Sequence, residues 1–284
     1  MKTLPRFLAL LAALTALVLS ATQCRRAKQA PVDTTAYPAA HGEKPEPAEL
    51  PKELIIDLGG GVTMEFILIR PGSFTMGSDK SAAKDEKPAH KVALTKPFYL
   101  GKYEVTQEQW EKVMGTNPSN FKGAKNPVEK VSYIDCQSFV AKLKEKVPGQ
   151  TFRLTTEAEW EYACRAGTAG NYCYGDGEGS LAEYAWYNSN ASNSTHPVGE
   201  KKPNAWGLYD MHGNVWEWCA DWDGEYPATA VDDPQGASSG SYRVNRGGSW
   251  LFSADDCRAA TRNGNDPSST GSNLGLRLAR SSVP

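Results

Sequence analysis

Apolar residues recur at helical spacing in three segments of the chain, each preceded by a hydroxyl side chain suited to cap a helix. The caps are Thr106, Ser132 and Thr156, and Gln109 and Glu159 stand three residues after the first and third, as in a capping box. The apolar stripes behind the caps comprise Trp110, Val113 and Met114; Cys136, Phe139, Val140 and Leu143; and Trp160, Ala163 and Cys164. Gly115, Pro148 with Gly149, and Gly167 follow as stop signals. We therefore predict three helices, each with a buried face.

A different pattern comes before and after these helices. Two β-rich runs, residues 54–56 and 63–69, flank the glycines 59–61, which is typical of a hairpin. After Thr168 the apolar runs are short and interrupted by Gly, Asn, Asp, Ser or Pro, with aromatic residues between them. This pattern is typical of long loops around short strands, and long ordered loops tend to be functional. With no internal repeat or second linker, residues 53–281 are predicted to form a single loop-rich α+β domain.

The first 23 residues have the pattern of an export signal. A short basic segment precedes an apolar run over residues 7–19, which is too short for a membrane-spanning helix of about 20 residues. Cys24 then stands where bacterial lipoproteins carry their acylated cysteine, although Gln23 replaces the usual Gly or Ala. Cleavage near Ala21 and free secretion is the alternative. We predict an exported protein, periplasmic or at the cell surface, anchored in the membrane through a lipid on Cys24.

Residues 24–52 are rich in Pro, Ala, Glu and Lys and have no periodic apolar face. Such a segment cannot bury enough surface to offset its ordering entropy, so we predict a disordered tether. The formal net charge of −2 gives no basic footprint, which argues against nucleic acid as a partner. Export permits disulfides among the five remaining cysteines.

Eight short motifs follow one another along the body. They lie at residues 64–66 with 71–78, 103–106 with 109–110, 126–128 with 131–133, 153–163, 207–211, 213–218, 246–250 and 275–277. In this order they resemble the formylglycine-generating enzyme family, also called sulfatase-modifying factors. The resemblance implies an elaborated C-type-lectin-like α+β fold with little regular secondary structure. Trp206, Trp216, Trp218 and Trp250 fall in or near these motifs, and we expect them to belong to the core.

The oxidase chemistry of this family requires two cysteines, five residues apart, shortly after a Gly-Gly-Ser motif. Together they bind copper(I), and soft thiolates are the ligands that select this ion. Counted forward from Gly247-Gly248-Ser249, the first position is Phe252 and the second is Cys257. Counted backward from Gly275, the segment is about three residues short, and Cys257 misses even the second position. Ser249 matches an active-site serine of the family, although it is equally a common turn residue. We therefore do not expect copper chemistry.

The resemblance also implies roles for other cysteines. Cys164 lies where exported members carry a structural cysteine, and its implied disulfide partner is Cys257, which would contribute about 2–4 kcal/mol. Two buried free thiols are the alternative. Cys136 is most simply a small core residue. Cys173 and Cys219 are left unassigned, since pairing does not follow from sequence.

Asn214, Val215 and Glu217 match the second calcium site of the family, which mixes side-chain and backbone oxygens. A turn asparagine and a solvated glutamate are the alternative. At the family's first calcium site, Trp186 replaces the asparagine. We predict structural calcium at the second site alone.

Other chemistries lack a signature. The four histidines, His212 among them, show no zinc or iron spacing, and no phosphate-binding or dinucleotide motif is present. We expect His212 to have a capping or packing role.

Two functions remain. The first is a surface-held, non-oxidase binding or assembly module whose loop-rich half recognises a protein or glycan partner. The second is a formylglycine-generating oxidase, or a related oxidoreductase, that acts on an exported sulfatase. Position 252 separates them, because a cysteine there would favour the oxidase and Phe252 argues against it.

Overall fold

The computed structural model describes residues 49–282 of the 284-residue chain. The export signal, Cys24 and most of the predicted tether lie outside these residues. Within the described part, no helix is long and apolar enough to cross a membrane.

The three predicted helices are confirmed. They are α1 (Gln107–Met114), α2 (Tyr133–Lys146) and α3 (Glu157–Arg165), capped by Thr106, Ser132 and Thr156. All three caps form complete capping boxes, because α2 also has one, through Asp135. A further short helix, α4 (Leu181–Tyr184), was not predicted; it lacks a side-chain cap and an apolar stripe of helical length.

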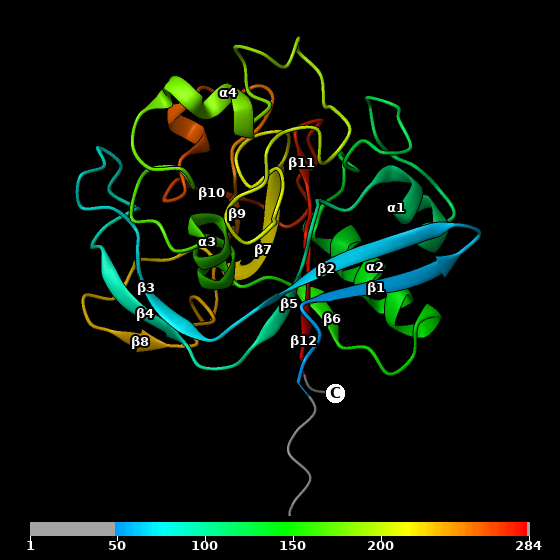
Figure 1. Ribbon diagram of the computed structural model, residues 1–284, viewed down its shortest axis with the longest axis horizontal. Helices are drawn as coiled ribbons and strands as arrows, with labels where there is room; N and C mark the ends of the chain where they lie inside the picture. Colours follow the sequence, from blue (N-terminus) through cyan, green and yellow to red (C-terminus); the bar gives the residue numbers. More distant parts are fainter. Residues whose placement is uncertain (1–48, 283–284) are drawn as a thin grey trace, which may run out of the picture. The chain divides into compact units, whose positions relative to one another are not determined.

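The strands form three small sheets (Figure 1). The five-stranded sheet has the order β1 (Glu53–Gly59), β2 (Val62–Ile69), β5 (Phe98–Gly101), β12 (Leu278–Ser281) and β6 (Phe152–Leu154). The four-stranded sheet has the order β10 (Arg262–Asn265), β9 (Arg243–Arg246), β7 (Trp216–Trp222) and β11 (Leu274–Gly275). The three-stranded sheet has the order β3 (Gly72–Met76), β4 (His90–Leu94) and β8 (Val231–Asp232).

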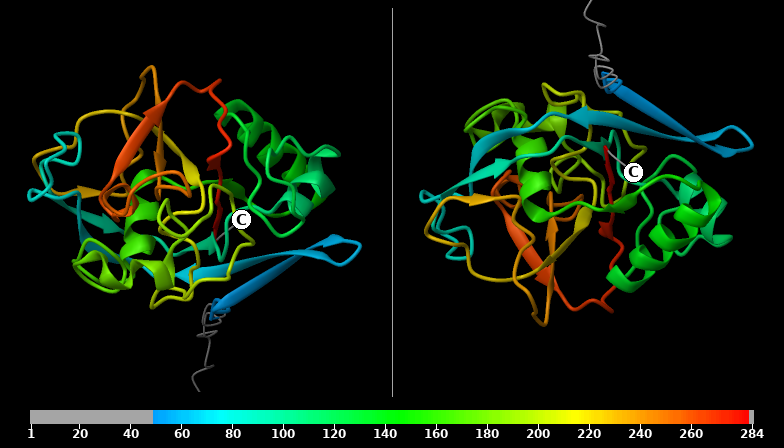
Figure 2. Two further views of the ribbon diagram at one scale, coloured as in Figure 1. Left: turned by 90° about the horizontal axis from the view of Figure 1, so that it is seen from above. Right: turned by 90° about the horizontal axis from the view of Figure 1, so that it is seen from below.

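The predicted hairpin is β1 and β2, paired in antiparallel register and projecting beyond the rest of its sheet (Figure 2). Helices α1 and α2 pack beside the five-stranded sheet, and their apolar faces share one core cluster with Phe66, Phe152 and Trp218. Cys136 belongs to this cluster as a buried free thiol, as predicted.

Helix α3 was expected to have one buried face, but all nine of its residues are buried. It lies between the three-stranded and four-stranded sheets and contacts β3, β7 and β9 (Figure 1). Its charged side chains are consequently enclosed. Glu161 accepts hydrogen bonds from Arg165, Arg246 and the backbone N–H of Gly77. The Arg246 ion pair joins the helix to the four-stranded sheet, and the Gly77 hydrogen bond joins it to the segment that follows β3.

Candidate functional site

The segment that follows β9 contains Phe252 and Cys257, the positions that the resemblance assigns to the redox pair. Gly247 and Gly248 have positive φ values of 106° and 74°, a region that favours glycine. A Cβ atom on Gly248 would lie 2.5 Å from the Cys257 Sγ, so the backbone passes directly over this thiol. Cys257 is fully buried, and burial raises the pKa of its thiol to about 12. At neutral pH it is a protonated core thiol and not a thiolate.

Phe252 occupies a packed position beside this segment. Its ring meets Trp216 edge-on at a centroid distance of 5.7 Å, and its backbone N–H donates to the Ser249 carbonyl at 3.1 Å. Ser249 is itself buried, and its Oγ accepts a hydrogen bond from the Leu251 N–H. Ser249 therefore occupies a turn. Neither candidate catalytic residue exposes its reactive atom to solvent, because Ser249 and Cys257 are both fully buried.

The disulfide predicted between Cys164 and Cys257 is absent from the structure, where both are free thiols. His212 contacts both residues: its Nδ1 lies 2.7 Å from the Cys257 carbonyl and its Nε2 lies 3.7 Å from the Cys164 Sγ. The Cys173 N–H donates to Nε2 at 3.0 Å, so Nδ1 carries the proton and donates to Cys257. Burial lowers the pKa of His212 to about 4, which keeps the ring neutral. His212 thus has the packing role expected of it.

The predicted calcium residues surround a cluster of buried carboxylates. Asn214 donates its amide to Glu104 at 2.7 Å and accepts from the His196 N–H, so its side chain is already satisfied. Glu217 accepts from the guanidinium of Arg277 and from the Trp160 indole N–H at 2.6 Å. The described residues contain no group of three His, Cys, Asp or Glu side chains placed to hold a metal. Asn214 and Glu217 both have protein hydrogen-bond partners in this arrangement.

One carboxylate in this cluster was missed by sequence reasoning. Asp210 is buried, its Oδ2 accepts from the Gly199 N–H at 2.7 Å, and its Oδ1 has no hydrogen-bond partner. Burial raises the pKa of Asp210 to about 6. Burial, and then the Asp210 and Glu217 carboxylates, also raises the pKa of Glu104 well above its usual value. Of these three carboxylates, Glu217 forms the ion pair with Arg277 at 2.7 Å, and the raised pKa values of Glu104 and Asp210 favour their protonated forms.

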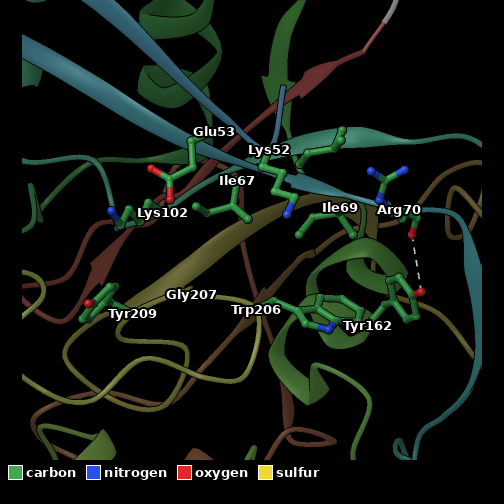
Figure 3. A pocket seen from close by; sticks show the side chains of 11 residues that line it. Lys52, Glu53, Ile67, Ile69, Arg70, Lys102, Tyr162, Trp206, Gly207 and Tyr209 are labelled. Atoms are coloured by element: carbon green, nitrogen blue, oxygen red, sulfur yellow. Dashed lines mark hydrogen bonds between the residues drawn. The ribbon is translucent and has the colours of Figure 1, made fainter. Parts of the chain in front are cut away.

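The described residues contain several open cavities of comparable size, and two of them bear on function. The first, of about 530 Å³, lies between β2 and the loop 206–209 and is shown in Figure 3. Trp206 lines it and is only partly buried, in contrast to Trp216, Trp218 and Trp250, which belong to the core as expected.

The second cavity, of about 420 Å³, is lined by Asp221, Glu157 and Tyr226 among other residues. Burial, and then the neighbouring Glu157 carboxylate, raises the pKa of Asp221 to about 7. No motif pointed to either cavity, because their walls come from segments far apart in the sequence.

Residues 60–282 match the model of the "Sulfatase-modifying factor enzyme 1-like domain". The chain is 33% identical to the chaperone protein LppX of Paenibacillus barcinonensis, over 78% of this chain and 90% of that protein. It is 36% identical to the formylglycine-generating enzyme of Streptomyces coelicolor, over 62% of this chain and 59% of that enzyme.

Among solved structures, variable protein 1 of Treponema denticola superposes with a TM-score of 0.75 at 35% identity. The superposition covers 81% of this chain and 99% of that chain. The predicted fold, a loop-rich C-type-lectin-like α+β domain, is confirmed.

Proposed function

Because the chain belongs to the family of sulfatase-modifying factor enzyme 1-like domains, we propose that it is a non-oxidase member, an exported binding or assembly module at the cell surface. The observation that supports this proposal is the state of the redox position. Phe252 packs on Trp216 where the first thiol would stand, and Gly248 covers the protonated thiol of Cys257. Neither residue offers a thiolate to copper(I), and the chemistry requires two.

The relatives are compatible with this proposal. The chain spans 90% of a protein named as a chaperone but 59% of the Streptomyces formylglycine-generating enzyme. Family membership therefore accommodates both assembly and oxidase roles, and the state of the redox position favours assembly. A lipid on Cys24, if present, would hold the domain near its partner at the membrane surface.

Copper retention tests the non-oxidase role. The purified mature chain is loaded with copper(I) under reducing conditions and dialysed, and bound copper is measured by elemental analysis. We expect no stoichiometric retention by the wild type, and none by Phe252→Cys, because Cys257 would still be buried and protonated. One equivalent of copper that is lost on Cys257→Ser would contradict the proposal.

Partner capture tests the binding role. The immobilised chain, incubated with a detergent-solubilised membrane fraction of the producing cells, should enrich a discrete protein or polysaccharide. A heat-unfolded sample of the same chain serves as the control. Enrichment of nothing beyond this control would count against a binding module.

We further propose that the family's structural calcium is retained, with Asp210 in place of Asn214 as the side-chain ligand. The buried Oδ1 of Asp210 lacks a hydrogen-bond partner and lies near the Glu104 and Glu217 carboxyl groups, and carboxylate oxygens are the ligands that Ca²⁺ takes. The Val215 carbonyl remains a candidate backbone ligand. When bound, calcium would offset the charge of this cluster and stabilise the loops around it.

Calcium should therefore raise the thermal midpoint. Millimolar calcium added to chelator-treated protein is expected to raise the midpoint by several degrees, as ligand binding to the folded state requires. Asp210→Asn should abolish this increase, whereas Asp176→Asn, at an exposed loop position, should leave it unchanged. An identical midpoint in calcium and in chelator would show that the site is not used.

A further inference from the structure

The cavity in Figure 3 combines an apolar centre with polar ends. Ile67 and Ile69, both buried and both from β2, form one wall, and Trp206 and Tyr162 stand opposite (Figure 3). The Trp206 and Tyr162 rings meet in a T-shaped contact at 4.8 Å, which fixes the indole in place. The volume of this cavity, about 530 Å³, falls within the range of small-molecule sites, roughly 300–1,000 Å³.

Several hydrogen-bond donors that line this cavity are unused. Within the described residues, the Lys52 ammonium, the Trp206 indole N–H and the Tyr209 hydroxyl make no hydrogen bond to protein. These side chains are exposed or half-buried, so a ligand that displaces water from them must supply acceptors in its place, and it should be rich in oxygen atoms.

The charges of the lining favour an anion. Lys52, Arg70 and Lys102 are cationic, and Glu53 is the one carboxylate among the lining residues. Lys102 is held by Glu65 at 2.9 Å, so it is already neutralised. Arg70 contacts Glu49 at 3.4 Å in a pair that is largely exposed, which contributes little. The Lys52 ammonium lies beside Ile69 and extends toward Trp206 (Figure 3), so an anionic group would be favoured at this end.

We propose that this cavity binds an acidic saccharide, a sugar residue that carries a carboxylate or sulfate group. The apolar C–H face of the sugar ring would pack on the Trp206 indole and the isoleucines. Its hydroxyls would accept from the indole N–H and the Tyr209 hydroxyl, and its anionic group would face Lys52, with the exposed Arg70 guanidinium contributing at longer range. A lipid acyl chain would leave these donors unpaired, so the lining favours the sugar. This inference rests on the proposed binding function and specifies its ligand.

Calorimetric titration tests the assignment. The full mature chain is titrated with a galacturonate trisaccharide, a chondroitin sulfate disaccharide and, as a neutral probe, a galactose trisaccharide. We expect an acidic probe to bind at least about tenfold more tightly than the neutral one, because charge-assisted hydrogen bonds distinguish them. Raising the salt concentration should weaken this preference.

Variants at exposed positions distinguish a loss of ligand binding from a loss of folding. Lys52→Gln combined with Arg70→Gln should weaken acidic-saccharide binding by about tenfold or more and leave the weak neutral binding unchanged. Lys142→Gln with Lys144→Gln removes the same charge from the exposed face of α2 and should change neither. The thermal midpoint of each variant confirms that the chain remains folded.

Three results would overturn the assignment: no binding of either acidic probe, an equal loss in the α2 control, or binding to phosphatidylglycerol vesicles alone that depends on Lys52 and Arg70. The last would identify a lipid surface as the ligand. If neither acidic saccharide binds, but no copper is retained and a partner is captured, the proposed binding function stands without this ligand. Stoichiometric copper binding would instead contradict the proposed function.

Discussion

Glu161→Ala is expected to destabilise the protein by about 3–5 kcal/mol, because removing one partner of a buried ion pair leaves the other charge uncompensated. Glu161 is fully buried, as is Arg246, and Arg165 is nearly so. The substitution would remove the carboxylate partner of Arg165, leave Arg246 with the longer Glu157 pair at 3.4 Å, and leave the Gly77 N–H without its acceptor. For a domain of this size the thermal midpoint should fall by about 10 °C. Urea unfolding followed by tryptophan fluorescence measures this loss.

Two matched variants serve as controls for Glu161→Ala. Glu161→Gln keeps the acceptor for Gly77 but removes the charge, so its loss should be smaller than that of the alanine variant. Glu108→Gln breaks the pair with Lys125, whose side chain is 67% exposed, and should cost less than about 1 kcal/mol. If the Glu161 variants were as stable as Glu108→Gln, the buried network would not hold the sheets around α3.

Asp221→Asn is expected to stabilise the protein at alkaline pH. The pKa of Asp221 is raised from 3.8 to about 7 in the folded state, so the folded chain retains a proton that the unfolded chain has lost. This contribution to stability is present below pH 4 and disappears as the pH rises to 7. The difference of about 3 pH units corresponds to roughly 4 kcal/mol. The asparagine is neutral at every pH and can still accept from the Glu157 N–H, as Asp221 does at 2.8 Å.

The difference between variant and wild type should therefore depend on pH. The free energies of unfolding should be similar near pH 4, and the variant should exceed the wild type by up to about 4 kcal/mol at pH 8. Asp232→Asn, which removes an exposed carboxyl from the rim of the same cavity, should follow the wild-type profile. A constant difference between Asp221→Asn and the wild type from pH 4 to pH 8 would show that Asp221 does not hold this proton.

Local signals in the sequence were sufficient for the helices and the first hairpin. Thr106, Ser132 and Thr156 act through hydrogen bonds three residues away, so their effect is visible in a short window. The pairing of β12 between β5 and β6 joins segments more than 100 residues apart. No periodicity in β12 indicates those neighbours.

The candidate functional site was less predictable from the sequence, because its contacts also join segments that are far apart along the chain. The glycines of the Gly247–Gly248 motif were visible, but the sealing of Cys257 by Gly248 depends on tertiary contact. Cys164 is a free thiol that lies beside His212, and spacing alone does not show this contact. Asp210 stands four residues before Asn214, and only its unpaired buried oxygen distinguishes it. The cavity beside Trp206 brings together β2 and a loop about 140 residues later, so its lining required the folded structure.

The most direct test of the non-oxidase role is the reaction itself. Purified protein, copper(I) and oxygen are incubated with a Cys-x-Pro-x-Arg peptide, and the peptide is followed by mass spectrometry and by aldehyde-specific labelling. With Phe252 in place of the first thiol and Cys257 sealed beneath Gly248, we predict that the peptide thiol is not converted and that no aldehyde forms. Catalytic formation of formylglycine, lost on Cys257→Ser, would contradict this account.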